Sequence, residues 1–92
     1  MRGRCYPDAV ASKFLRALGG RIREMRKARG RSQEALAADL GFDRAVLGRI
    51  ERGAKNVTMT TAARIANALH ADLDELLRGL PRYDPSDDEP SD

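Results

Sequence analysis

The stretch SQEALAADLGFDRAVLGRIERG, residues 32–53, contains two short helical patterns separated by a glycine. Ser32 is a residue type that caps helix N-termini, and the apolar residues after it recur at intervals of three and four, as on one face of a helix. Gly41 is expected to end this helix, because glycine readily adopts the left-handed backbone conformation that closes helices. Asp43 can cap a second helix, which Gly53 ends. The stretch therefore predicts a short helix, a tight turn and a second short helix.

The second of these helices has two faces of different chemistry. At 100° per residue, its large apolar side chains fall within one arc of the helix, and small or basic residues occupy the opposite arc. The apolar arc contains Val46, Leu47 and Ile50. The opposite arc contains Arg44, Ala45, Gly48, Arg49 and Arg52. We expect the apolar arc to pack on the core and the basic arc to face a partner.

Helical spacing extends on both sides of this stretch, and no alternation typical of strands occurs. Ser12 is expected to cap a first helix that runs to Arg29. Gly19 and Gly20 interrupt it, and each glycine costs about 1 kcal/mol relative to alanine in a helix interior. Its stable part is therefore expected to begin near Leu18.

Two further helices are expected after residue 53. Thr58 is expected to cap a fourth helix, and Asp72 with Glu75 resembles a capping box at the start of a fifth. The inward side of the fourth helix is expected to carry Met59, Ala62, Ile65, Ala66 and Leu69. The fifth carries Leu73, Leu76, Leu77 and Leu80. The sequence thus predicts an all-α fold, a compact five-helix domain over residues 12–80.

The segments outside this domain differ from it in charge. Residues 81–92 carry a net charge of −4 and residues 1–80 a net charge of +7, within a chain total of +3. We expect residues 1–11 to form a flexible basic arm and residues 81–92 a disordered acidic tail. A basic folded part is typical of proteins that bind polyanions, although a basic solubilising surface remains an alternative. With no long apolar run and no secretory signal, a cytoplasmic protein without membrane contact is expected.

The sequence does not predict an enzyme. Cys5 is the only cysteine and His70 the only histidine, and they lie far apart in the sequence. Catalysis usually needs a nucleophile, a base and a group that orients the base, and a metal site needs several ligands. The phosphate-binding glycine motifs of nucleotide-binding proteins are also missing. We therefore expect no catalytic residues, no metal site and no cofactor.

The basic arc of the third helix favours binding to duplex DNA. Arginine can donate two hydrogen bonds to O6 and N7 of guanine, and the major groove of B-DNA admits one α-helix. A short helix followed by a tight turn and a basic helix is an arrangement that presents such a face.

Residues 18–77 resemble the lambda-repressor-like, or Cro/repressor-type (XRE), helix-turn-helix family. The resemblance rests on the spacing of Gln33, Ala37, Gly41, Leu47 and Ile50. The chain departs from the family pattern at Arg31, where an apolar residue is usual, and at Gly20.

The resemblance implies a role for each of several residues. Base edges would be faced by Arg44, Ala45, Gly48 and Arg49, of which the glycine offers no side chain. Phosphates would be contacted by Gln33, Arg52, Lys55 and Asn56. Arg26 and Glu51 would form a partly buried salt bridge.

The expected function is a sequence-specific transcriptional regulator that binds double-stranded DNA as a homodimer on a pseudo-palindromic operator. The dimer is inferred from a surplus of apolar surface on the last helix, with an expected interface of Leu73, Leu76, Leu77 and Leu80. Small size and five helices resemble restriction–modification controller proteins in particular. The alternative is an antitoxin or phage-type regulator that also binds and inhibits a partner protein, and RNA polymerase is a further candidate partner.

Overall fold

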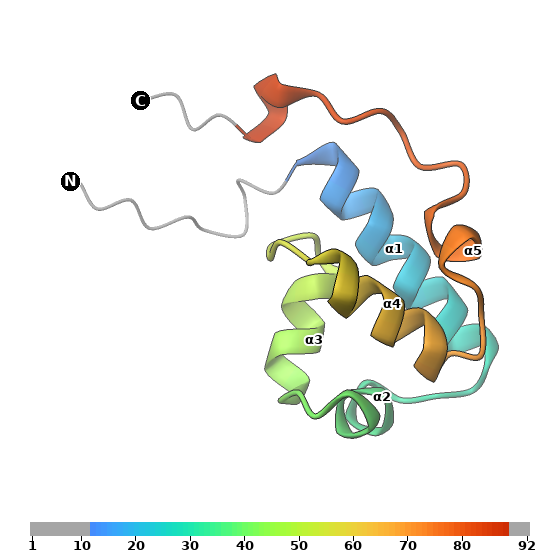
Figure 1. Ribbon diagram of the computed structural model, residues 1–92. Helices are drawn as coiled ribbons and strands as arrows, with labels where there is room; N and C mark the ends of the chain where they lie inside the picture. The colour runs from blue at the N-terminus through green and yellow to red at the C-terminus, as the bar shows by residue number, and fades with distance from the viewer. Residues whose placement is uncertain (1–11, 89–92) are drawn as a thin grey trace.

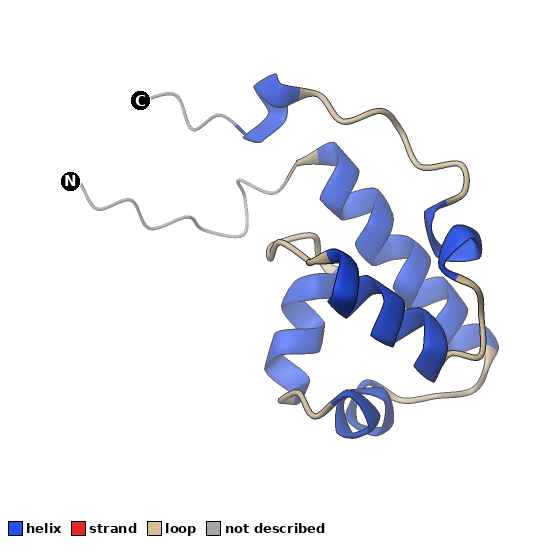
Figure 2. Ribbon diagram, in the orientation of Figure 1, coloured by secondary structure: helices blue, strands red, loops and turns tan. Residues whose placement is uncertain are grey.

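A computed structural model describes residues 12–88, which form five α-helices and a C-terminal 3-10 turn (Figures 1 and 2). The elements are α1 (Lys13–Ala28), α2 (Gln33–Leu40), α3 (Arg44–Glu51), α4 (Met59–Ala68), α5 (Leu73–Leu77) and η2 (Pro85–Asp88). No strand occurs in the described range, so the predicted all-α, five-helix fold is confirmed. The predicted arm at residues 1–11, with Cys5, and the last four residues of the acidic tail lie outside the described residues.

Each helix begins where the sequence predicts. Ser12, Ser32 and Thr58 each accept a hydrogen bond at 3.0 Å from the backbone N–H three residues later. These bonds satisfy N–H groups that have no partner within the helix. At the start of α5, the Glu75 side chain accepts a 2.9 Å hydrogen bond from the backbone N–H of Asp72.

The turn between α2 and α3 is closed by Gly41, which has a φ of 74°. The next amide, that of Phe42, donates to the carbonyl of Ala37 at 2.9 Å, so the end of α2 is hydrogen-bonded through the turn. Phe42 packs against the core. Asp43 occupies the N-cap position of α3 as expected, but its side chain makes no capping hydrogen bond.

The expectation that α1 is stable only from Leu18 onward is wrong, because α1 is one continuous helix through both glycines. Gly19 allows α1 and α3 to approach closely. A Cβ atom on Gly19 would lie 2.4 Å from the carbonyl oxygen of Ile50. Gly53 contributes to the same contact from the other side, since a Cβ there would lie 2.6 Å from the backbone of Arg16. The end of α3 is thus held against the backbone of α1.

One core lies among the five helices. α1 packs against both α3 and α5, and α2 bridges α3 and α4 (Figure 1). The largest fully buried side chains are Ile22, Leu36, Leu47, Ile65, Leu69 and Leu76. Met59 was predicted to face the core, and it does not. Met59 is 63% exposed at the first position of α4.

The short helix α5 is attached to α1 through Arg21. The guanidinium of Arg21 donates to the carbonyl of Glu75 at 2.7 Å and to that of Arg78 at 2.6 Å. These carbonyls lie at the end of a helix and lack helical partners. One arginine of α1 therefore caps the last turn of α5.

The described part of the acidic tail is exposed from residue 81 to residue 86. Its turn is closed by Asp84, whose carboxylate accepts hydrogen bonds from the amide and the hydroxyl of Ser86. These bonds lower the pKa of Asp84. Disorder of the whole tail remains a prediction. Among the described helices, none has both the length and the apolar character to span a bilayer.

Candidate nucleic-acid interface

The predicted division of α3 into two faces is present in the structure. Leu47 and Ile50 are fully buried, whereas Arg44, Ala45 and Arg49 are exposed. Arg52, at the C-cap of α3, is also exposed. The exposed face of α3 is thus basic around a small residue, as the helical periodicity predicts.

Gly48 differs from the other residues assigned to this face, because it is buried. A Cβ at this position would lie 3.5 Å from a terminal nitrogen of Arg52 and 3.9 Å from the side-chain nitrogen of Gln33. Gly48 therefore lies beneath two polar side chains, and in this structure those side chains, and not the glycine, present a surface.

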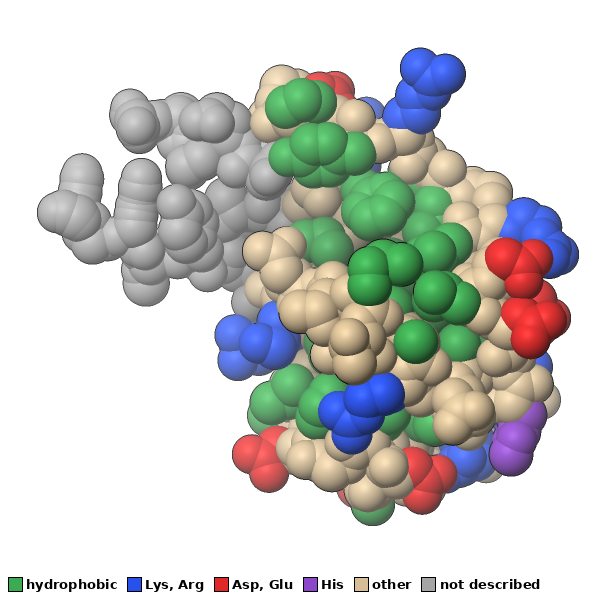
Figure 3. Space-filling model, in the orientation of Figure 1, with side chains coloured by type: hydrophobic (Ala, Val, Ile, Leu, Met, Phe, Trp, Pro, Cys, Tyr) green, Lys and Arg blue, Asp and Glu red, His purple; other side chains and the backbone are tan. Residues whose placement is uncertain are grey.

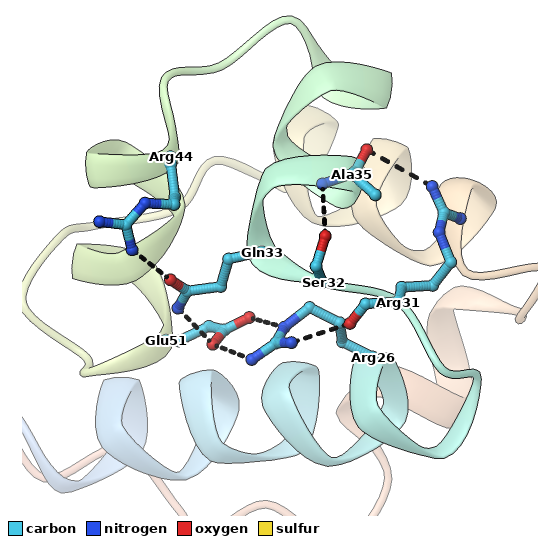
Figure 4. Close-up of polar contacts among 7 residues, drawn as sticks. All are labelled: Arg26, Arg31, Ser32, Gln33, Ala35, Arg44 and Glu51. Carbon is cyan, nitrogen blue, oxygen red and sulfur yellow. Dashed lines mark hydrogen bonds and ion pairs between the residues drawn. The ribbon is translucent and has the colours of Figure 1, made fainter.

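The ion pair that the family resemblance implies is formed between α1 and the end of α3 (Figure 4). The Arg26 guanidinium donates from Nε to Glu51 Oε2 at 2.7 Å and from Nη2 to Glu51 Oε1 at 3.0 Å. Both side chains are nearly inaccessible to solvent, with 8% and 3% exposed. The hydrogen bond to Glu51 raises the pKa of Arg26, so this guanidinium stays charged despite its burial.

Gln33 connects this ion pair to the exposed face of α3. Its amide nitrogen donates to Glu51 at 2.9 Å, and its amide oxygen accepts from Nη1 of Arg44 at 3.2 Å (Figure 4). A continuous series of hydrogen bonds therefore runs from the buried Arg26 to the exposed Arg44. The sequence reasoning assigned Gln33 only a phosphate contact and missed this positioning role.

Glu34 was also missed by the sequence reasoning. Its carboxylate lies 3.5 Å from Nε of Arg44, and both side chains are largely exposed, Arg44 at 59% and Glu34 at 71%. Both partners of Arg44 thus come from the first turn of α2. The signal in the sequence was a carboxylate directly after Gln33. Gln33 precedes Arg44 by eleven residues, and Glu34 precedes it by ten.

An open hollow of about 480 Å³ lies where α1, the start of α2 and the end of α3 meet. Arg23 and Arg52 line it together with Ser32 and Gln33. The N-terminus of α2 carries the positive end of the helix dipole, and backbone N–H groups there can donate to an anion. These groups can donate to a phosphate oxygen, and the carboxylates of Glu34 and Glu51 line the same hollow.

The other residues predicted to contact phosphate lie in the loop between α3 and α4. Lys55 and Asn56 are both exposed there, close in sequence to the end of α3. The predicted phosphate contacts therefore come from the start of α2, the end of α3 and the loop that follows α3.

The four leucines assigned to a dimer interface separate into two groups. Leu76 is fully buried within the protomer's own core, so it is not available to a second copy. Leu73, Leu77 and Leu80 are partly buried against that core. Figure 3 shows hydrophobic side chains at the surface between α4 and α5. Within residues 12–88, no group of His, Cys, Asp or Glu side chains could hold a metal ion.

A two-helix unit joined by a tight glycine turn, with its second helix basic on the outside, defines a helix-turn-helix domain. Residues 22–76 match the family HTH_3, described as helix-turn-helix, and the chain belongs to this family. The family resemblance inferred from the sequence is thereby confirmed.

Two curated relatives align over most of this domain. An uncharacterised HTH-type transcriptional regulator of Bacillus subtilis, YazB, is 40% identical over 58 residues, covering 63% of this chain and 84% of YazB. The control protein C.SmaI of Serratia marcescens is 37% identical over 60 residues, covering 65% of this chain and 71% of C.SmaI.

A solved structure with the same fold is that of the restriction–modification controller protein C.AhdI from Aeromonas hydrophila. The two superpose with a TM-score of 0.65 at 44% sequence identity. The superposition covers 67% of this chain and 94% of C.AhdI, so it includes almost the whole controller protein.

Proposed function

We propose that this protein is a transcriptional regulator that binds duplex DNA sequence-specifically through the exposed face of α3. The observation that carries the proposal is the basic outer face of α3 on a helix-turn-helix whose last residue is fixed to α1 by a buried ion pair. The similarity to an HTH-type transcriptional regulator and to two controller proteins supports it.

Arg44 and Arg49 are the proposed base-reading residues. Each is exposed, and each can offer two parallel N–H donors to the major-groove edge of a guanine. Ala45 lies between them in the sequence and leaves room for close approach to a base, including the methyl group of thymine. Contacts of this kind carry sequence information, so these residues are proposed to set operator choice.

Phosphate contacts are proposed for Gln33, Arg52, Lys55 and Asn56. Gln33 lines the hollow at the N-terminus of α2, and Arg52 lines the same hollow from the end of α3. Lys55 and Asn56 are exposed in the following loop. Such contacts fix the position of the protein on the duplex and add affinity on any sequence.

A homodimer is proposed as the DNA-binding form, with an interface that includes Leu73, Leu77 and Leu80. These side chains are partly buried beside α4, where hydrophobic side chains reach the surface (Figure 3). A single eight-residue reading helix contacts few base pairs, and a two-fold dimer doubles the sequence that is read. Two such helices would lie about 34 Å apart, one turn of DNA, on a pseudo-palindromic operator.

Within this class, we propose a restriction–modification controller. Its support is the similarity to C.SmaI and C.AhdI and the near-complete coverage of C.AhdI by this chain. Neither catalysis nor a cofactor has a part in this proposal, and a regulator of this kind would act in the cytoplasm, where bacterial DNA lies.

Selection of bound duplexes from a randomised pool tests the proposal. The protein is expected to enrich one pseudo-palindromic motif with half-site centres about one helical turn apart. A footprint on that motif should protect both half-sites. A pool that shows no enriched motif after repeated rounds would contradict sequence-specific binding.

A further inference from the structure

We infer that Glu34 is a specificity-determining residue, which restrains the guanidinium of Arg44 from pairing with the phosphates of non-cognate DNA. This inference rests on the proposed function, because it assumes that Arg44 reads a base. It starts from the 3.5 Å separation between the Glu34 carboxylate and Nε of Arg44.

Arg44 is held at two of its three nitrogens in the free protein. Gln33 accepts from Nη1, and the carboxylate of Glu34 faces Nε (Figure 4 shows the first contact). Gln33 is in turn fixed by the buried carboxylate of Glu51. The side chain of Arg44 is therefore kept near the first turn of α2, although more than half of its surface is exposed.

A carboxylate on a DNA-binding face carries an electrostatic cost, since the duplex is strongly negative. Pairing with Arg44 offsets that cost only while the pair persists. When Arg44 contacts a phosphate, two anions share one guanidinium and repel each other, whereas the O6 and N7 acceptors of guanine are neutral. The net gain from an Arg44–phosphate contact is consequently small.

A guanine presents a different partner. Each terminal nitrogen of arginine carries two hydrogens, so the guanidinium can donate two parallel bonds to O6 and N7 from its end while Nε still faces a carboxylate. Base reading by Arg44 is thus compatible with the Glu34 contact. Glu34 should lower the affinity for non-cognate DNA more than the affinity for the operator.

Arg49 offers an internal comparison on the same face of α3. It is exposed, and no carboxylate partner for it is found among the described side chains of residues 12–86. An effect of Glu34 that acts through its contact with Arg44 should therefore depend on Arg44 and not on Arg49.

The test measures binding of Glu34→Gln to the selected operator and to a mixed-sequence duplex of equal length. Exposed ion pairs are weak, so we expect about twofold to fivefold tighter binding to the mixed-sequence duplex. Binding to the operator should change less than about twofold by the same reasoning. If Arg44 gains a phosphate contact, the salt dependence on the mixed-sequence duplex should steepen by about 0.9 in log–log slope.

Double variants and a charge control complete the experiment. The effect of Glu34→Gln should vanish in an Arg44→Ala background and persist in an Arg49→Ala background. Glu24→Gln removes one exposed carboxylate of α1 and controls for the change in net charge. Equal gains on both duplexes, or an effect that survives Arg44→Ala, would overturn the inference in favour of general repulsion. Failure of the proposed function would show separately, because the unmodified protein would then not distinguish the two duplexes.

Discussion

Arg26 and Glu51, 25 residues apart in the chain, form a buried two-pronged ion pair with N–O distances of 2.7 and 3.0 Å. The pair joins the scaffold helix α1 to the last residue of α3. Because Gln33 is bonded to the same carboxylate, the start of α2 is fixed to that point as well. One buried carboxylate thus contacts both α1 and the start of α2 from the end of α3.

Removal of either partner of this ion pair should destabilise the fold. Arg26→Ala and Glu51→Ala are each expected to lower the free energy of unfolding by about 3 kcal/mol, because each leaves a buried charge without its partner. The double variant should recover much of the loss. Denaturant unfolding of the four proteins measures the coupling, and additive single effects would show that the pair contributes nothing as a pair.

The adjacent glycines of α1 should respond in opposite directions to alanine. Gly19→Ala places a methyl group 2.4 Å from the carbonyl oxygen of Ile50, so we expect a loss of more than about 1 kcal/mol through overpacking. Gly20 has nothing within 4 Å of its Cβ position, and Gly20→Ala should stabilise α1 by about 0.5–1 kcal/mol. Thermal unfolding of both variants checks this, and a stabilising Gly19→Ala would contradict the close helix contact.

The sequence predicted all five helices because their caps and apolar spacing are local signals. It did not predict the continuity of α1, because the reason for Gly19 is a contact with Ile50, 31 positions away. Helix propensity alone predicts that each glycine destabilises α1. The close packing of α1 on α3, however, requires glycine at position 19.

Arg31 shows the same dependence on distant partners. An apolar residue is usual there in the resembled family, yet this arginine forms an ion pair with Asp39 and donates to the carbonyl of Ala68 at 3.5 Å. It thereby connects the first loop to α2 and α4 with polar contacts. The sequence shows that Arg31 departs from the family pattern, but it does not show that the carbonyl of Ala68 accepts a hydrogen bond from Arg31.

The candidate site was predicted well where helical periodicity decides exposure and poorly where side chains meet across elements. The exposed arginines of α3 follow from their positions on the helix. The contacts of Arg44 with Gln33 and Glu34 require the tertiary approach of α2 and α3, which no local pattern encodes. The burial of Leu76 likewise depends on how α5 packs against the rest of the domain.

His70 provides a test of backbone strain at the end of α4. It has a φ of 57°, which is unfavourable for a residue with a side chain. His70→Gly should therefore stabilise the protein by roughly 0.5–1 kcal/mol, less any entropy that glycine adds to the unfolded chain. Calorimetry measures the change in Tm, and a lowered Tm would indicate that the histidine side chain makes a contribution larger than this strain.

The proposed dimer predicts which apolar residues control self-association. Leu73→Glu and Leu77→Glu should shift the protein toward monomer, because each introduces a charge into the proposed interface. Met59→Glu is the matched control, since Met59 is an exposed apolar residue at the start of α4 that is not assigned to the interface. Sedimentation at micromolar concentration checks this. Unchanged mass in both leucine variants would contradict the assigned interface.

The central claim is that the exposed face of α3 reads base sequence, and base preference at each operator position tests it most directly. Arg49→Ala and Arg44→Ala should each relax preference at one position per half-site, with a cost of about 1–3 kcal/mol on the operator. Lys55→Ala should weaken binding to all duplexes alike. If all three variants lowered affinity uniformly across sequences and kept every base preference, α3 would not be the reading helix.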